Sequence, residues 1–448
     1  MKKFLIIIGI LLIGVGAFVY FFFISAKKVS YELEFEFEKE VNLVDYKSDL
    51  PCTINHKFDT SKMGDYTYKY RCSDSKKSYD VTLKYTVLKF SDVNLDLDIY
   101  KEANVSDFSS QIPCLEDHKF DTDKLGEYDY SYRCNSDEDM YRINVKYNVL
   151  DREKPLVLAR DSYSVTRNYD KPVSELMLAI DNYDKDITKE IIGEYDLTRV
   201  GNYNLTLNVK DSSGNISSND FVLKVIEKTN NKTTTSNSFL AFSEMRDKYK
   251  TNDTKVGIDV SKWQGDIDFS KVKAAGAEFV MIRIGYQDGF DGEYVVDPYY
   301  EKNIAGALEN GLDVGVYFYT YSKNSEEAVK QAEWIVEKLN GQKLALPIVF
   351  DWESWSSLNS IKTSIHDFNE MANAFLAKVT EKGYEGMLYS SKNYLEKIWY
   401  KSDYKTWLAH YTFNTNYEGD YYMWQMCSDG RIDGIKGDVD IDILYLNK

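Results

Sequence analysis

Histidine is scarce in this chain, with only four among 448 residues, and neither an HExxH nor a CxxC spacing occurs. These absences exclude the common zinc-ligand arrangements, so we predict no metal site of that kind and no cofactor. The sequence also lacks an excess of positive charge, because 72 acidic residues outnumber 55 Lys and Arg and give a formal net charge of −17. That balance excludes a nucleic-acid-binding protein that relies on a basic surface.

Cysteine is limited to five residues, and four of them form a repeated pattern. Residues 51–72 begin with PC and end with HKFDTSKMGDYTYKYRC, and residues 113–134 repeat this as PC and HKFDTDKLGEYDYSYRC. The repeat predicts two disulfides, Cys52–Cys72 and Cys114–Cys134, one in each of two related modules in an oxidising compartment. The fifth cysteine, Cys427, is predicted to be a buried free thiol.

A third module is predicted over residues 152–227. Its segments DNYDKDIT (181–188) and DSSGN (211–215) resemble those of immunoglobulin-like modules of bacterial surface proteins. Short strands separated by turns favour a β-sandwich here. Asp181, Asp184 and Asp186 suit either a calcium site or a solvated turn, and the loop lacks the full ligand set of a known calcium motif. The polar, Thr- and Asn-rich residues 228–253 predict an exposed linker.

The N-terminus is a nearly continuous apolar run over residues 4–24, with two lysines on each side. Its length reaches the roughly 20 residues that a bilayer-spanning helix needs. A cleaved signal peptide has a shorter apolar core and a small-residue cleavage site, which Ile24-Ser25-Ala26 fits poorly. We therefore predict an uncleaved transmembrane helix at about 4–25, with residues from 27 onward outside the cell; secretion after cleavage is the alternative.

The C-terminal part alternates apolar strands with helical patterns. The expected strands are 256–260, 279–285, 314–321, 344–353 and 387–390, followed by 406–411, 421–426 and 439–444 without long helical patterns between them. Asp268 can cap a first helix that Gly276 ends, Ser325 starts a second that Gly341 ends, and a third runs near 365–382. This alternation predicts a parallel, TIM-like β/α barrel of eight strands, with helices mainly after the first five.

Four acidic residues fall at or near the ends of these strands. Asp351 and Glu353 lie on the same side of one strand because side chains alternate. Two carboxyl groups held close on one face cannot both ionise easily, so one tends to stay protonated while the other carries charge. Glycoside hydrolysis needs such a pair of carboxyl groups. The alternative is an ordinary solvated strand end. Asp259 and Asp440 lie at the same edge of the predicted barrel, where the chemistry of such folds sits.

Residues from about 255 to the C-terminus resemble family 25 glycoside hydrolases, the muramidases of the Chalaropsis type. The resemblance rests on GIDVSKWQGDIDF (257–269), GVYFYTYS (315–322), PIVFDWES (347–354), WLAHY (407–411), MWQM (423–426) and GDVDIDILY (437–445). It implies a flattened α/β barrel of five β/α units and then three strands. The D-x-x-D-x-D-x-E signature of chitinase-like enzymes is absent.

The resemblance also implies the reaction, which is cleavage of the β-1,4 bond from N-acetylmuramic acid to N-acetylglucosamine in peptidoglycan. By motif, Glu353 resembles the general acid and Asp351 its partner carboxylate, which steers the substrate's N-acetyl group or stabilises the cationic transition state. Asp259 and Asp440 match the two further acids of the family's cleft. Spacing does not decide between retention and inversion, which depends on the separation of the carboxyl groups.

Aromatic residues near the acids suit stacking on sugar rings, or alternatively packing of the barrel. We favour Tyr319, Trp407 and Tyr411 for substrate contact, followed by Tyr317 and Trp424. Trp263 and Trp352 have the same two interpretations. His410 alternates out of phase with Trp407 and Tyr411, so we expect it to face outward.

The predicted organisation has six parts: 1–28 anchor, 29–90 and 91–151 disulfide modules, 152–227 third module, 228–253 linker, and 254–448 catalytic barrel. The predicted partners are peptidoglycan and, through the N-terminal helix, the cytoplasmic membrane. The modules either act as a spacer, which we favour, or bind glycan or protein. The alternative to an enzyme is a surface protein whose barrel binds glycan without cutting it.

Overall fold

The structure is a computed structural model that describes residues 26–137, 139–228 and 239–447. The chain divides into two compact units, residues 1–152 and 153–448. The predicted transmembrane helix at 4–25 lies outside the described residues. Within the described part, no helix combines the length and apolar character needed to cross a membrane.

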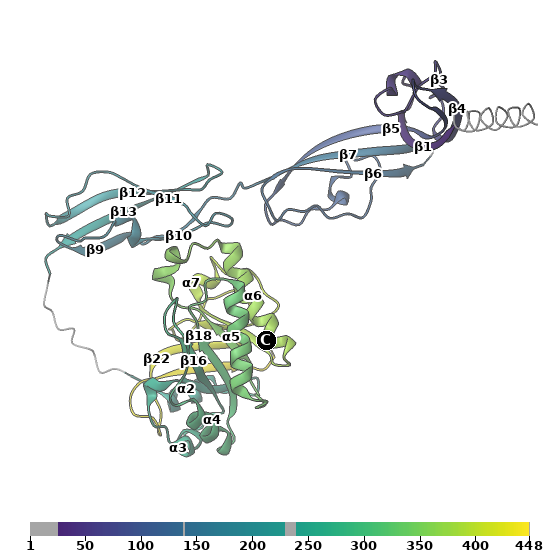
Figure 1. Cartoon of the computed structure of the whole chain (residues 1–448). Helices are drawn as coiled ribbons and strands as arrows, with labels where there is room; N and C mark the ends of the chain where they lie inside the picture. The colour runs from purple at the N-terminus through teal and green to yellow at the C-terminus, as the bar shows by residue number, and fades with distance from the viewer. Residues whose placement is uncertain (1–25, 138, 229–238, 448) are drawn as a thin grey trace, which may run out of the picture. The chain divides into compact units, whose positions relative to one another are not determined.

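One long strand organises the first unit. Strand β5 (Ser78–Asp98) has 21 residues, and its first half pairs with β1 (Lys27–Glu36) in parallel and with β4 (Gly64–Ser73) in antiparallel orientation. Its second half pairs in parallel with β7 (Asp139–Leu150), which pairs in turn with β6 (Gly126–Ser136). The two sequence repeats therefore form one continuous sheet (Figure 1), so the expectation of separate immunoglobulin-like modules is not confirmed for them.

The two repeats contain matching small elements. Strands β2 (Val41–Asn42) and β3 (Lys57–Phe58) form a short ladder beside the 3-10 helix η1 (Leu43–Tyr46), and η2 (Val105–Phe108) occupies the equivalent place in the second repeat. Both predicted disulfides, Cys52–Cys72 and Cys114–Cys134, are present. In each repeat a tyrosine hydroxyl donates to the carbonyl oxygen of the first cysteine, Tyr70 to Cys52 (3.1 Å) and Tyr132 to Cys114 (2.6 Å).

The third module is all-β and belongs to the second unit. Strands β11 (Thr188–Ile192), β12 (Gly201–Lys210), β13 (Ile216–Ile226) and β9 (Ser162–Thr166) form one sheet, and β8 (Leu156–Leu158) pairs with β10 (Leu178–Ile180), preceded by η3 (Val173–Leu176). Asp184 accepts hydrogen bonds from the backbone and hydroxyl of Ser212 (2.6 and 2.9 Å), and Asp186 pairs with Lys362 (3.1 Å). These contacts favour the turn interpretation for Asp184 and Asp186. Asp181 differs, because it is buried with Asp151 and Asp211, and carboxylate oxygens of the three lie within 4.8 Å of one another, an arrangement that could hold a cation.

Eight strands close into a barrel in the rest of the second unit. The ring runs β15 (Thr254–Val260), β16 (Phe279–Gln287), β18 (Asp313–Tyr319), β19 (Ile348–Asp351), β20 (Gly386–Ser391), β21 (Lys405–Ala409), β22 (Met423–Arg431) and β23 (Val439–Tyr445). Neighbours from β15 to β22 are parallel, whereas β23 is antiparallel to both β22 and β15 and closes the ring. Two short strands, β14 (Leu240–Ala241) and β17 (Tyr294–Val296), pair outside the ring.

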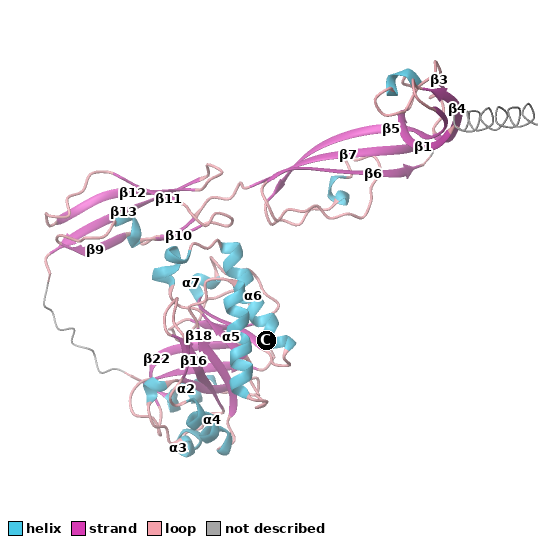
Figure 2. Cartoon of the chain, in the orientation of Figure 1, coloured by secondary structure: helices cyan, strands magenta, loops and turns pink. Residues whose placement is uncertain are grey.

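Helices are few around this ring (Figure 2). They are α2 (Phe242–Tyr249), α3 (Phe269–Ala274), α4 (Tyr300–Glu309), α5 (Ser325–Leu339), α6 (Ile365–Glu381) and α7 (Lys392–Leu395), with 3-10 helices η4 (Lys262–Gln264) and η5 (Trp355–Ile361). Side chains of Asp268, Asn324 and Ser364 cap α3, α5 and α6 by accepting from backbone N–H groups. Capping by Asp268 agrees with the sequence, and α5 begins at the predicted Ser325.

This architecture corrects the predicted fold class of a TIM-like α/β barrel with five β/α units and then three strands. The C-terminal part is instead a closed eight-stranded β-barrel with few helices. The β17 hairpin interrupts the second connection, and α7 has only four residues. Apolar periodicity predicts which residues are buried. It does not predict whether the connection between two strands forms a long, regular helix.

Side-chain alternation divides the barrel core into two regions. The interior of the ring is filled by Phe279, Met281, Val349, Met387, Trp407 and Met423 among others. Residues of opposite phase, such as Ile258, Phe350 and Ile441, pack between the ring and the helices. Gly257 faces the interior, where an added Cβ would lie 2.5 Å from the carbonyl oxygen of Phe279, so the narrow interior requires glycine there. As predicted, Cys427 is a buried free thiol.

Candidate active site

The predicted acids converge in one cavity at one end of the barrel interior. Asp259 comes from β15, Asp351 from the end of β19, and Asp440 from β23, while Glu353 follows β19 by two residues. All four line a cavity of about 240 Å³, which we call the acid cavity. Tyr317, Tyr319, Trp407 and Tyr411 line it as well, and Trp263 stands at its edge with 76% of its surface exposed.

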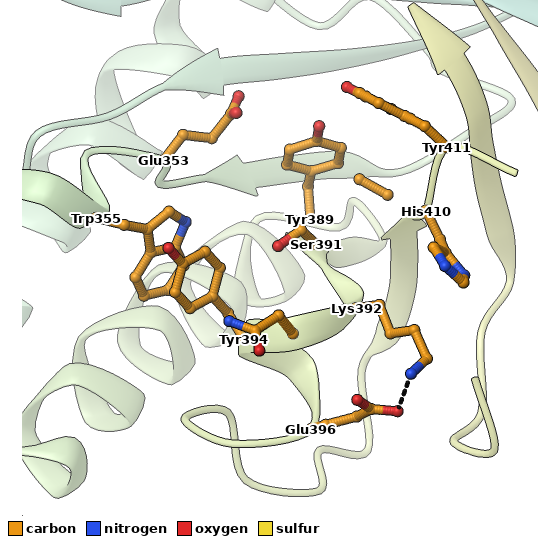
Figure 3. A pocket seen from close by; sticks show the side chains of 11 residues that line it. Glu353, Trp355, Tyr389, Ser391, Lys392, Tyr394, Glu396, His410 and Tyr411 are labelled. Atoms are coloured by element: carbon orange, nitrogen blue, oxygen red, sulfur yellow. Dashed lines mark ion pairs between the residues drawn. The ribbon is translucent and has the colours of Figure 1, made fainter. Parts of the chain in front are cut away.

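Glu353 also opens into a second space, the outer cavity, of about 560 Å³. The polar ends of Glu353, Tyr389 and Tyr411 converge between these spaces (Figure 3). His410 lines the outer cavity rather than the acid cavity, and its Nδ1 lies 2.9 Å from the hydroxyl of Thr415. Because β21 ends at Ala409, strand alternation no longer fixes the direction of the His410 side chain.

One predicted aromatic contact, Trp424, is wrong, and Trp352 takes the packing alternative. Trp424 is 2% exposed in the layer between ring and helices, and its Nε1 donates to the carbonyl oxygen of His410 (2.8 Å). Its neighbours Met423 and Gln425 face the interior, so the alternation of β22 turns Trp424 away from it. Trp352 is fully buried for the same reason, between Asp351 and Glu353, and donates to the carbonyl oxygen of Ser322 (3.1 Å).

Gln425 is a member of the site that the sequence analysis missed. Its Nε2 donates to Asp259 Oδ2 (2.8 Å), and its Oε1 accepts from the hydroxyls of Tyr389 (2.8 Å) and Tyr411 (3.1 Å). One amide therefore fixes an acid and two tyrosines of the cavity wall. The signal that would have found it is a lone polar residue at an inward position of the strand MWQM.

Arg283 is the second missed residue, and it supplies positive charge to the acid cavity. It is largely buried on β16 and pairs with the fully buried Asp297, with N–O distances of 2.7 and 2.8 Å. Its charge opposes the rise of the Asp351 pKa. A single arginine inside the apolar strand FVMIRIG was the available signal.

Asp351 and Glu353 form a hydrogen-bonded carboxyl pair. Burial raises the pKa of Asp351 well above its ordinary value, and the charge of Glu353 raises it further. Burial of the Glu353 carboxyl group raises its pKa too, although the hydrogen bond with Asp351 opposes this rise. Asp351 is only 3% exposed, whereas Glu353 is reachable from the cavities. The pair therefore retains a proton at a pH where an exposed carboxyl group has lost it, and Glu353 is the member that can pass it to a ligand.

A second carboxyl pair lies deeper, where Asp259 and Asp442 are hydrogen-bonded to each other. Asp442 is fully buried and accepts from Trp407 Nε1 (2.9 Å). Burial raises the pKa of both groups, and the charge of Asp440 adds to this. Burial also raises the pKa of Asp440 itself to about 7. Asp442 is the third residue missed from the sequence.

Replacement of Asp442 by asparagine should stabilise the barrel near neutral pH. A carboxyl group whose folded pKa is raised binds protons in the folded state that the unfolded state has lost. Its stabilising contribution is therefore present below the unfolded pKa of about 3.9 and disappears as the pH rises toward the folded value. Asparagine keeps the acceptor for Trp407 and removes this loss, so we expect a melting temperature about 2–4 °C higher at neutral pH and little gain under acidic conditions.

Thermal unfolding of the full chain across this pH range measures the effect. The matched control is Asp403→Asn, because Asp403 is exposed and its loss should leave the melting temperature unchanged. Equal changes in melting temperature at acidic and neutral pH for Asp442→Asn would contradict the prediction.

The barrel residues are similar in sequence to a known protein family. Residues 258–435 match the family model for glycosyl hydrolases family 25, a range that includes Asp259, Asp351 and Glu353 and ends before Asp440. The uncharacterized protein YegX of Escherichia coli K12 is 29% identical over 194 residues, covering 42% of this chain and 68% of YegX. The autolytic lysozyme of Clostridium acetobutylicum is 26% identical over 189 residues, covering 42% of this chain and 54% of that protein.

Among solved structures, a family 25 glycosyl hydrolase from Bacillus anthracis is similar, with 23% identity and a TM-score of 0.40. It covers 48% of this chain and 96% of its own. The family match and the lysozyme relatives identify the barrel as a glycoside hydrolase domain. They support the hydrolysis of peptidoglycan in general.

Proposed function

We propose that this chain is a muramidase that hydrolyses the β-1,4 bond from N-acetylmuramic acid to N-acetylglucosamine in peptidoglycan. The observation that carries the proposal is the proton-retaining pair of Asp351 and Glu353 in a cavity walled by aromatic side chains. A sugar polymer offers flat, partly apolar ring faces that such side chains contact well. The aromatic walls and the acid pair together suit a glycan substrate.

In the proposed reaction, Glu353 gives its proton to the glycosidic oxygen as the bond from the anomeric carbon to that oxygen breaks. The departing sugar leaves with a hydroxyl group, and positive charge develops on the remaining ring. The negative charge left on the Asp351 and Glu353 pair stabilises that ring, directly or through the substrate's N-acetyl group. Water then adds to the anomeric carbon and returns a proton to Glu353.

The proposed location is outside the cytoplasm. Support comes from the two disulfides, because disulfides persist in oxidising compartments. The proposal does not depend on an anchor. The catalytic roles of the individual acids remain predictions from the sequence.

The rate of cleavage should fall with rising pH, at a pH above the one where an exposed carboxyl group loses its proton. The general acid acts only while protonated, and both Glu353 and its partner have raised pKa values. Activity is therefore present below the pKa of the pair and lost above it, by about tenfold for each further pH unit. Measurement of kcat on soluble glycan strands from about pH 4 to about pH 9 tests this. A rate that stays constant up to the alkaline end would exclude a carboxylic acid as the proton donor.

A digest of purified peptidoglycan by the full chain, with products identified by mass spectrometry, tests the function itself. Fragments that carry N-acetylmuramic acid at the reducing end are expected. Fragments with other ends would assign a different cell-wall hydrolase. Tight binding without any cleavage would assign the glycan-binding alternative.

A further inference from the structure

The third module contacts the barrel at the start of α6, within the same compact unit. The carbonyl oxygen of Asp181 accepts from the backbone N–H of Ile365 in the first turn of α6 (2.7 Å), and Lys185 forms an ion pair with Asp367 (2.6 Å). Ile180 of β10 is buried in the same core as the residues between the ring and the helices. The module therefore packs on the segment that follows Glu353.

A hollow of about 540 Å³ lies along this contact, and we call it the module pocket. Both partners line it. The module contributes Leu158, Arg160 and Tyr163, and the barrel contributes Trp355, Tyr394 and Lys397.

The module pocket adjoins the outer cavity at two aromatic rings. Trp355 and Tyr394 line both the module pocket and the outer cavity that contains Glu353. Their rings are stacked with centroids 3.6 Å apart and planes 13° from parallel (Figure 3). The outer cavity, which Glu353 lines, and the module pocket therefore have a wall in common.

The charge of the module pocket differs from that of the chain as a whole. Arg160 and Lys397 are exposed, and neither forms an ion pair among the described residues. The positive charge of Arg160 also reaches the aromatic wall, because it opposes the rise of the Tyr394 pKa that burial causes. Glu175 is the acid that lines the pocket, and the nearby Lys189 partly balances its charge. In a chain with a net charge of −17, two available cations in one hollow favour an anionic ligand.

We propose that the module pocket binds the anionic peptide stem carried by the muramic acid units of peptidoglycan, so that the third module is part of the substrate-binding surface. This inference rests on the proposed muramidase function and adds the class of substrate, which is glycan that still bears its peptides. The stem ends in a free carboxylate, which an arginine can bind through two parallel hydrogen bonds. The stacked rings of Trp355 and Tyr394 offer an apolar face to the aliphatic side chains of the stem.

The test compares two substrates made from one glycan preparation: uncrosslinked strands that carry their stems, and the same strands after an amidase has removed them. The full chain and its variants are assayed on both, and kcat and KM are determined separately. For the wild type we expect a kcat/KM about tenfold higher on stem-bearing strands, the size expected of one charge-assisted contact. Arg160→Ala and Lys397→Ala should each reduce this preference severalfold through KM.

Two further variants sharpen the test. Arg160→Lys keeps the charge and should restore part of the preference, which a purely structural role would not predict. Arg199→Ala is the matched control, because Arg199 is an exposed arginine of the same module on the loop between β11 and β12. It should leave the preference unchanged.

The outcomes separate the two proposals. Equal kcat/KM values for the wild type on both substrates, or variants that lower both values alike, would overturn the peptide-binding proposal while leaving the muramidase intact. Failure of the wild type to cleave either substrate would instead overturn the proposed function.

Discussion

Replacement of Glu353 by glutamine should reduce the turnover of peptidoglycan by about 1,000-fold, within the range that one general acid contributes. Glutamine has nearly the same size as glutamate, but it has no proton of suitable acidity to give to the glycosidic oxygen. Glu353 lines both cavities, whereas Asp351 is 3% exposed and lines the acid cavity alone, so Asp351 is poorly placed to replace it. Reducing-end N-acetylmuramic acid, quantified over time by mass spectrometry, measures the loss.

The matched control for this variant is Glu309→Gln, at the exposed C-terminal end of α4. It should digest peptidoglycan at the wild-type rate. Binding of Glu353→Gln to insoluble peptidoglycan should persist, because the aromatic walls of the cavity remain. Turnover by Glu353→Gln within a fewfold of the wild type would transfer the role of proton donor to another group.

Replacement of Arg283 by methionine should lower the free energy of unfolding of the barrel by about 3–5 kcal/mol, the loss typical when one partner of a buried ion pair is removed. Asp297 would remain completely buried with its carboxylate opposite an apolar side chain. Two backbone N–H groups, from Lys262 and Tyr299, still donate to Asp297 and limit the damage. The double variant Arg283→Met, Asp297→Asn should recover part of the loss, because it removes the uncompensated charge.

Denaturant unfolding followed by tryptophan fluorescence isolates the barrel, because all seven tryptophans of the chain lie between residues 263 and 424. Lys302→Met is the control, since it breaks the exposed ion pair with Asp266 and should cost less than about 1 kcal/mol. A loss for Arg283→Met no greater than that of Lys302→Met would show that the buried pair contributes little to stability.

The acids of the site could be predicted from the sequence, because Asp259, Asp351, Glu353 and Asp440 stand in recognisable motifs at strand ends. Arg283 and Gln425 were missed because each is a single polar residue within an apolar stretch, and Asp442 because Asp440 had already been chosen from the same strand. That these three side chains point toward the interior follows only from the register of the closed ring. Trp424 illustrates the same limit. A shift of one residue in the register of a strand turns every side chain that faced the interior toward the helices, and the reverse.

The fold was predicted less completely than the acids. The number of strands in the barrel agrees with the sequence, but the connections are less regular than predicted, because a hairpin interrupts the second one and α7 has only four residues. The first two repeats were expected to be separate modules. Residues 78–98 instead continue the alternation of a strand without a turn signal, and the boundary predicted at residue 90 falls inside β5. That prediction followed sequence similarity, which marks the repeat but not the end of a strand.

The shared strand β5 has a mechanical consequence. Lys27 at the start of β1 pairs opposite Tyr79 near one end of β5, and Leu150 at the end of β7 pairs opposite Asp98 at the other end. Tension applied to the chain on either side of this sheet therefore pulls β1 and β7 lengthwise along β5 in opposite directions. The hydrogen bonds of both ladders are loaded together in shear rather than opened one after another. Under force, each of the two ladders should therefore yield only at a high threshold.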